Sequence, residues 1–177
     1  EPEFPGVDQF AGQVVHPQKW PENLDYKGKR DVVIGSGATA MTLVPAMAKD
    51  AKHVTMLQRS PTYVVSRPST DAVANGLRKV LPDRVAYNIT RWKNSTMGEF
   101  FYKQTRSRPE KVKGQLLGLI RKELPDEMVD EHFTPAYNPW DQRLCLIPDS
   151  DLFKALNSDT ASVVTAEIET FTATGIT

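Results

Sequence analysis

The hydrophobic positions between residues 29 and 60 change their period twice. Residues 30–37 read RDVVIGSG, a run of β-branched apolar residues closed by glycines, which predicts a buried strand. In residues 38–50 the apolar positions recur with helical spacing, and Pro45 among them predicts a kink. Residues 53–60 read HVTMLQRS and predict a second strand. A strand, a glycine turn, a helix and a strand in so short a span form a βαβ unit, so the sequence predicts a parallel sheet.

Beyond this unit, helical and irregular patterns alternate. Amphipathic segments between residues 69 and 132 predict helices, whereas residues 133–148 are rich in Pro and polar residues and predict a loop. Residues 150–157 predict a short helix with Ser150 as its N-cap. Residues 161–174 are rich in Val and Thr and predict one or two further strands.

These patterns predict how the chain is divided. Residues 1–28 are rich in Pro and Gly and are predicted to be a connecting segment. Residues 29–68 and 133–177 are predicted to form one α/β domain of the Rossmann-like kind, with residues 69–132 as a helical insertion. The sequence starts without Met, and we expect it to be a piece of a longer protein.

One motif with a chemical meaning stands where the first strand ends and the first helix begins. It fits G-x-G-x-x-G/A with the residues Gly35, Ser36, Gly37, Ala38, Thr39 and Ala40. In this motif the first glycine allows the tight turn, the second lets a pyrophosphate approach the backbone, and the last position packs the helix on the strand. The amides that open the helix then face the phosphates. The alternative is a plain strand–turn–helix built from small residues.

The end of the second strand indicates which dinucleotide binds. An NAD site carries Asp or Glu about 20 residues beyond the glycines, to bind the ribose 2′-hydroxyl. Here the position holds Gln58, Arg59 and Ser60, with no carboxylate. An arginine can hold a 2′-phosphate through two parallel hydrogen bonds, and a serine can add a donor. The sequence therefore predicts NADP(H) as cofactor, with these three residues in the site, unless Arg59 is only a surface charge.

The charges are balanced over the whole chain but not along it. The 22 Lys and Arg equal the 22 Asp and Glu, which gives no general reason to expect nucleic acid binding. Residues 78–122, however, hold twelve Lys or Arg against three Asp or Glu, and an acidic stretch follows at 123–131. This basic block fits a solvated helical cover over a substrate cleft. Attachment to an anionic membrane surface and nucleic acid binding are the alternatives.

Cysteine and histidine give no sign of metal or nucleophile chemistry. The single cysteine, Cys145, lies between two leucines and is predicted to be a core residue, so no internal disulfide can form. Three scattered histidines lack metal-ligand spacing, and we predict no metal site; His53 and His132 are predicted to be structural. No apolar run is long enough to span a bilayer. We predict a cytoplasmic protein, with membrane association left open.

The opening stretch resembles a known family fingerprint. Residues 10–22 read FAGQVVHPQKWPE and match F-x-G-x-x-x-H-x-x-x-W followed by Pro or Asp, the fingerprint of type I Baeyer–Villiger monooxygenases, which also precedes the glycine loop in that family. Three more stretches are similar to the ethionamide-activating branch of these flavin-containing enzymes: GKRDVVIGSGATAMTLVPAMA, HVTMLQRSPTYV and PWDQRLCLIPDSDLF. The resemblance covers almost the whole chain.

The resemblance implies an enzyme that uses FAD, NADPH and O2. In such enzymes a C4a-peroxyflavin inserts one oxygen atom into a ketone to give an ester or lactone, or oxidises a sulfide. Only one G-x-G-x-x-G/A motif is present here, so the chain resembles the NADP-binding domain and lacks the FAD domain of the same polypeptide. Alone it is expected to be inactive. The alternatives are an N- or S-hydroxylating flavin monooxygenase and a non-catalytic NADP(H)-binding module.

The resemblance also implies roles for residues outside the glycine loop. Arg143, in WDQRLCL, would be the active-site arginine that stabilises the peroxyflavin anion and holds the nicotinamide. An ion pair with Asp141 or Asp149 is the alternative.

The fingerprint itself would be the linker between the FAD and NADP domains. In it Gly12 would permit a tight turn, and His16 and Trp20 would form a hinge. His16 is the second catalytic candidate. Its alternative is packing and hydrogen bonding in a fixed loop, and direct proton transfer is its least favoured role.

Overall fold

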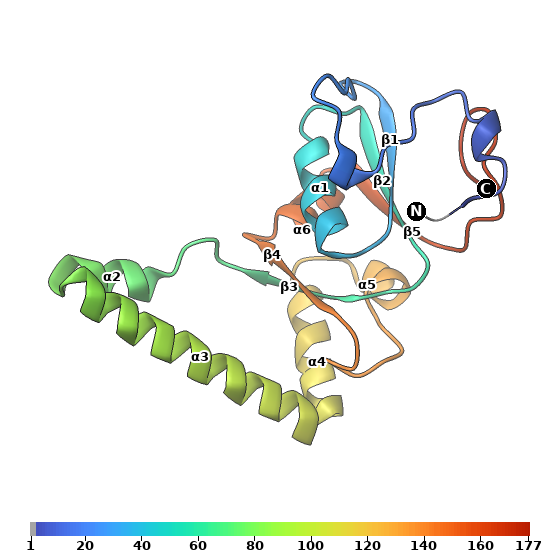
Figure 1. The fold of residues 1–177 in the computed structure, drawn as a ribbon. Helices are drawn as coiled ribbons and strands as arrows, with labels where there is room; N and C mark the ends of the chain where they lie inside the picture. The colour runs from blue at the N-terminus through green and yellow to red at the C-terminus, as the bar shows by residue number, and fades with distance from the viewer. Residues whose placement is uncertain (1–2) are drawn as a thin grey trace.

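The computed structural model describes residues 3–177 and is built around a parallel sheet of three strands (Figure 1). Strands β1 (Arg30–Ile34), β2 (His53–Gln58) and β5 (Ala161–Thr165) pair in the order β1-β2-β5, and both pairings are parallel. The predicted βαβ unit and the predicted α/β class are thereby confirmed. Strand β2 is largely buried, whereas Val32 and Ile34 of β1 are 46% and 42% exposed, so the prediction that residues 30–37 contain a buried strand is wrong for one face of β1.

Helices α1 (Ala38–Met47) and α6 (Asp151–Asn157) pack against each other and against this sheet (Figure 1). Their apolar side chains and those of the sheet form one core. Its most deeply buried members include Met41, Val44, Met56, Leu152 and Phe153. The helix α1 continues for two residues beyond Pro45, which lies in its last turn.

A second parallel pair lies beside the first sheet and was missed by sequence reasoning. Strands β3 (Tyr63–Arg67) and β4 (Leu144–Pro148) pair with Tyr63 opposite Leu144. The predicted loop over residues 133–148 is therefore wrong from residue 144 onward. The strand is only five residues long and stands directly after a Pro-rich polar stretch, so its alternation is short and easily overlooked. Its stabilising partner lies far away in the sequence.

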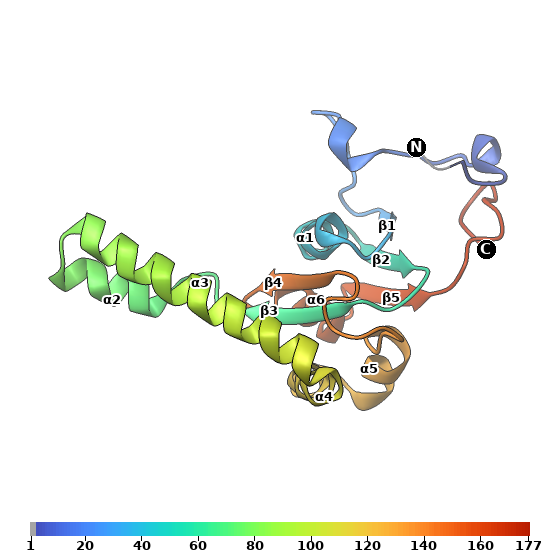
Figure 2. The same ribbon diagram turned by 60° about the horizontal axis from the view of Figure 1, so that its bottom comes forward.

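The helices expected between residues 69 and 132 are present. They are α2 (Ala72–Val80), α3 (Asp83–Ser107), α4 (Pro109–Ile120) and α5 (Asp126–His132). Helix α3 is continuous over 25 residues, a length of about 37 Å. Figures 1 and 2 both show α2 and the far half of α3 projecting from the rest of the molecule, and we call this pair the arm. The base of α3 meets α4, which packs on β3.

The N-terminal segment from Phe4 to Ala11 packs against residues 171–173 near the C-terminus. Two short 3₁₀ helices, η1 (Val7–Gln9) and η2 (Pro17–Lys19), lie in the N-terminal segment. The ring of Phe171 contacts those of Phe4 and Phe10, and its backbone N–H donates to the carbonyl of Pro5 at 2.8 Å. Beyond β5 the only further strand-like feature among the described residues is an isolated bridge between Phe171 and Ile176.

Ser150 precedes α6 as predicted but does not cap it with its side chain. Its φ is 57°, in the left-handed region, and no side-chain capping bond forms. Its Oγ instead lies 2.8 Å from Ser66 Oγ and donates to Glu123 Oε1 at 3.1 Å. The N-cap prediction is wrong in its mechanism, because the Ser150 hydroxyl contacts Ser66 of β3 and Glu123 in the turn after α4.

Candidate functional site

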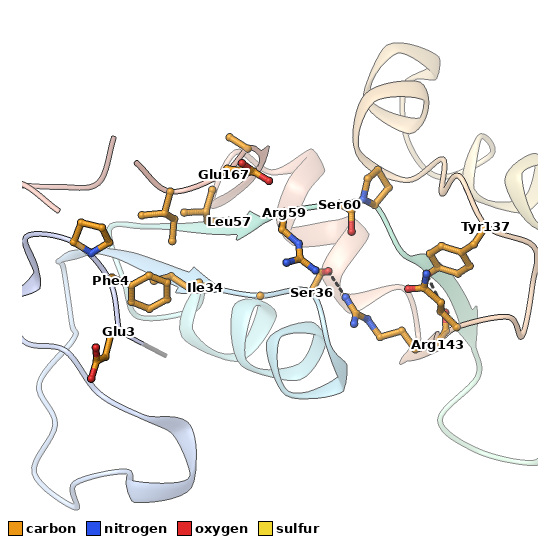
Figure 3. A pocket seen from close by; sticks show the side chains of 16 residues that line it. Glu3, Phe4, Ile34, Ser36, Leu57, Arg59, Ser60, Tyr137, Arg143 and Glu167 are labelled. Carbon is orange, nitrogen blue, oxygen red and sulfur yellow. Dashed lines mark hydrogen bonds between the residues drawn. The ribbon is translucent and has the colours of Figure 1, made fainter. Parts of the chain in front are cut away.

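A cavity of about 500 Å³ opens at the carboxyl ends of the three parallel strands (Figure 3). Its lining includes Gly35 and Ser36 after β1, Arg59 and Ser60 after β2, and Arg143 just before β4. In open parallel α/β sheets, ligands bind at the carboxyl ends of the strands. The structure thus brings together five of the residues predicted to form a site, from segments more than 100 positions apart.

The glycine loop shows why its first glycine is needed. Gly35 has a φ of +119°, a conformation that L side chains rarely adopt, and its N–H donates to the carbonyl of Leu57 at 2.7 Å. Gly37 has an ordinary φ of −81°, and a Cβ added there would meet no protein atom within 4 Å. No described residue therefore requires glycine at position 37.

The remaining loop residues begin α1. Ala38 and Thr39 form its first turn next to the cavity but are not part of the lining. Ala40 lies within α1 and is buried, at the position that was predicted to pack the helix on the strand. No acidic residue stands in the first turn, so the positive end of the helix dipole is not neutralised by the protein's own side chains there.

Gln58 does not belong to the site. Its side chain is 1% exposed, and its Nε2 donates to the carbonyl of His132 at 2.8 Å and to Thr165 Oγ1 at 3.0 Å. His132, at the end of α5, also contacts Thr165 Oγ1 through Nδ1 at 2.8 Å. The prediction that Gln58 binds the cofactor is wrong for its side chain, because the last position of β2 points into the protein and ties α5 to β5.

Arg143 reaches the glycine loop. Its Nη2 donates to Ser36 Oγ at 3.0 Å, and the Ser36 side chain is itself buried (Figure 3). The alternative ion pairs do not form: Asp141 pairs with Arg106, and Asp149 accepts the N–H of Ser69 at 3.0 Å. Arg143 also directly precedes strand β4. Its position is therefore set by the edge of the second sheet.

A polar network that the sequence did not reveal holds this arginine's backbone. The hydroxyl of Tyr137 donates to the carbonyl of Arg143 at 3.1 Å and lies 2.9 Å from Thr62 Oγ1. The carbonyl of Tyr137 accepts the hydroxyl of Tyr63 at 2.7 Å. Burial, reinforced by Tyr137, raises the pKa of Tyr63 to about 12, so this hydroxyl stays a donor. In the sequence, only the presence of Tyr137 in the loop before β4 could have suggested this network.

The chemistry of the other nearby groups is limited. Burial raises the pKa of the Cys145 thiol, against a weaker opposing effect of Arg143, so the thiolate that a nucleophile needs is disfavoured. Glu167, beyond β5, also lines the cavity and was not predicted (Figure 3). Within residues 3–177 no cluster of metal-ligating side chains exists.

Gly12, His16 and Trp20 of the fingerprint lie outside the lining of this cavity, although Phe4 and Pro5 of the same segment belong to it. His16 precedes η2 and accepts the N–H of Gln18 through Nδ1 at 3.3 Å. Trp20 contacts the ring of Tyr26 edge to face at 6.1 Å. Gly12 has no positive φ, and a Cβ there would lie 2.6 Å from the Phe10 ring, so close packing rather than a tight turn explains this glycine. The structure does not bring His16 to the other candidate catalytic residue, Arg143.

The fold and the loop define the class of protein. A parallel sheet, a left-handed glycine after β1 and a cavity at the carboxyl ends of the strands are the features of the Rossmann type of α/β fold. The family model described as "Flavin-binding monooxygenase-like" matches residues 1–127. The chain belongs to this family, and the predicted resemblance to flavin-containing monooxygenases is confirmed.

Similar proteins and structures carry related names. The chain is 57% identical over 177 residues to the "Probable FAD-binding monooxygenase AlmA" of Acinetobacter baylyi and 53% identical to the "FAD-containing monooxygenase EthA" of Mycobacterium tuberculosis. Each alignment covers 99% of this chain and 36% of the relative. The chain thus spans about a third of the length of these relatives.

Two solved structures share the fold. A crystal structure of OTEMO in complex with FAD and NADP matches with a TM-score of 0.73 at 21% identity, over 100% of this chain and 41% of that one. An oxidised steroid monooxygenase bound to NADP matches with a TM-score of 0.74 at 22% identity, over 99% and 41%. At such identities the likeness concerns the fold.

Proposed function

We propose that this chain is the NADP(H)-binding portion of a flavin-dependent monooxygenase. The observation that carries the proposal is the cavity itself, in which the glycine loop meets Arg59 and Arg143. Arg59 and Arg143 form no ion pair within the described part of the chain. A guanidinium group without an ion pair at the end of β2 favours a ligand with an anionic group at that place, as NADP has in its 2′-phosphate.

The residues present fit NADP(H). The open space at Gly37 and the unneutralised start of α1 suit a pyrophosphate. Arg59 and Ser60 follow β2, where the ribose of a dinucleotide is recognised, and would hold its 2′-phosphate. Two carboxylates line this cavity, Glu3 in the N-terminal segment and Glu167 after β5. Neither follows β2, so neither stands in the usual place of an NAD-specific acid.

FAD does not fit this chain. The sequence offers one glycine loop of the dinucleotide type, and the second sheet carries none. We therefore assign FAD to another domain of the same polypeptide. When bound, the two cofactors supply hydride transfer and the activation of O2, and this chain orients the nicotinamide nucleotide for the first step.

Arg143 would serve the reacting end of the cofactor. Its guanidinium is always charged and presents several donors, which suits stabilisation of developing negative charge. The hydrogen bond to Ser36 and the support from Tyr137 keep it at the mouth of the glycine loop. His16 would order the linker between the domains, which agrees with its capping of η2.

The whole enzyme would insert one oxygen atom into a hydrophobic ketone or oxidise a sulfide. The fingerprint around His16 and Trp20 supports this reaction over N- or S-hydroxylation, and membership of a flavin monooxygenase family supports it over a non-catalytic NADP(H) module. Product analysis of the purified holoenzyme with a ketone, a sulfide and an amine separates these three outcomes.

Calorimetry with NADP⁺ and NAD⁺ tests the nucleotide assignment. We expect tighter binding of NADP⁺, and Arg59→Ala should weaken only NADP⁺ binding, by about 1.5–3 kcal/mol, because the lost partner is the 2′-phosphate. Arg30→Ala is the matched control, since Arg30 is exposed at the opposite end of β1. Equal affinities of the unmodified protein for both nucleotides would contradict the assignment.

A further inference from the structure

Helix α3 and the end of α2 expose an apolar stripe that no described residue covers. On α3, Val85, Ile89, Trp92 and Phe100 are spaced by four, three and eight residues, so they lie on one face of the helix. All four are exposed, Trp92 by 71% and Phe100 by 64%. At the end of α2, Val80 is 76% exposed. Helix α3 buries only Ala86 and Thr105 within this chain.

Cations surround the outer end of this stripe. Arg78 and Lys79 form the last turn of α2, while Arg84 and Arg91 lie seven residues apart on one side of α3. None of the four is in an ion pair within residues 3–177. Between residues 72 and 92 the sequence holds a single carboxylate, Asp83. The tip therefore combines exposed apolar side chains with a clear excess of positive charge.

We propose that the tip of the arm, residues 77–92, binds the surface of a membrane that contains anionic phospholipids. An interfacial helix places Trp, Phe and aliphatic side chains among the acyl chains while Lys and Arg reach the headgroups. The tip has both parts in adjacent positions, and Figures 1 and 2 show it at the far end of the arm, clear of the rest of the molecule.

The charge argues for lipid over other occupants of the stripe. Nucleic acid would use the cations but not the apolar stripe, because its phosphates need no apolar contact. A second copy of the chain would bring four like charges against four others. The arm does not cross the membrane: among the helices described, none is apolar over a span long enough to do so. The proposal is independent of the NADP(H) assignment.

Vesicle sedimentation of the full-length protein tests the proposal. We expect it to bind vesicles of phosphatidylcholine mixed with phosphatidylglycerol, to bind phosphatidylcholine alone weakly, and to lose affinity as salt rises. Trp92→Ser should weaken the partition on the order of tenfold, since a large interfacial side chain is removed.

The charge requirement is tested with matched variants. Changing all four cations of the tip to Gln should weaken the partition about a hundredfold. The control changes four exposed lysines elsewhere to Gln and should alter the partition by no more than about twofold: Lys19, Lys27, Lys49 and Lys52. Circular dichroism checks that each variant keeps its helices.

Three results would overturn the proposal. The first is equal or absent binding to both kinds of vesicle, which is also the result if the rest of the polypeptide covers the stripe. The second is a lipid-free dimer that Trp92→Ser dissociates, which would make a second copy the occupant. The third is an equal loss of affinity in the tip variant and the lysine control, which would show that binding depends on the net charge of the protein and not on the tip.

Discussion

Two regions of this molecule hold guanidinium groups that form no ion pair among residues 3–177, and the two regions differ in shape. In the cavity, Arg59 and Arg143 face a concave site with the buried Ser36 between the strand ends. At the tip of the arm, Arg84 and Arg91 stand on a convex helix beside the exposed Trp92. A concave site with fixed donors selects a small anion of defined geometry, whereas a convex cationic helix meets an extended surface. The same side-chain chemistry therefore supports two different binding functions.

The largest expected difference between the regions concerns stability. Phe153 is 1% exposed and packs edge to face on Phe133 in the core, so Phe153→Ala should lower the free energy of unfolding by about 3–5 kcal/mol. Trp92→Ala on the arm removes an exposed ring and should change it by no more than about 0.5 kcal/mol. Urea unfolding of both variants measures this. A large loss in Trp92→Ala would show that the arm is held by contacts outside this chain.

The next largest effect concerns Arg143 in the full-length enzyme. Arg143→Ala should lower the rate of product formation about 10²–10³-fold, because a charged donor at the reacting end is lost. NADP(H) should still bind through Arg59 and the glycine loop. Arg143→Lys should restore little, since an ammonium group lacks the planar fork. The measurement is ester or sulfoxide formed per NADPH consumed. Near-normal oxygenation by Arg143→Ala would mean that the arginine is structural.

A smaller effect sharpens the role of Ser36 in the cavity. If its hydroxyl positions Arg143, the losses of NADP⁺ affinity in Ser36→Ala and Arg143→Ala should be coupled by about 0.5–1.5 kcal/mol in a double-mutant cycle. Ser60→Ala is the control, because Ser60 lines the cavity without bonding to Arg143. If the losses in Ser36→Ala and Arg143→Ala are additive, the two side chains act independently and Ser36 does not position Arg143. That result would leave the proposal that the chain binds NADP⁺ unchanged.

The smallest effect is a pH dependence at the root of the arm. Hydrogen bonds from Lys93 and from the backbone N–H of Ala74 lower the pKa of Asp71 to about 2. A carboxyl whose pKa is lowered on folding stabilises above its ordinary pKa, and this stability is lost as pH falls toward the lowered value. Melting temperatures of the wild type and Asp71→Asn should therefore differ above about pH 4 and converge near about pH 2. Parallel curves would show that Lys93 contributes nothing there.

Much of the fold could be predicted from local pattern. The βαβ unit, the glycine loop and the helices of the arm depend on periodicity and turn chemistry within short windows, which a sequence displays directly. The pairing of β3 with β4 could not be found in this way. Each strand has five residues, and Tyr63 pairs with Leu144, which lies 81 positions further along the chain.

Within the site, the sequence by itself determined which chemistry is present, and the tertiary structure decided which residues share it. Residue types alone indicated a phosphate-binding loop and an arginine after the second strand. Only the packing showed that Gln58 turns inward to α5 and β5, while Arg143 turns to Ser36, which is 107 positions away. The direction in which a side chain points at the end of a strand depends on neighbours from other segments, and these are brought there only by the folded core.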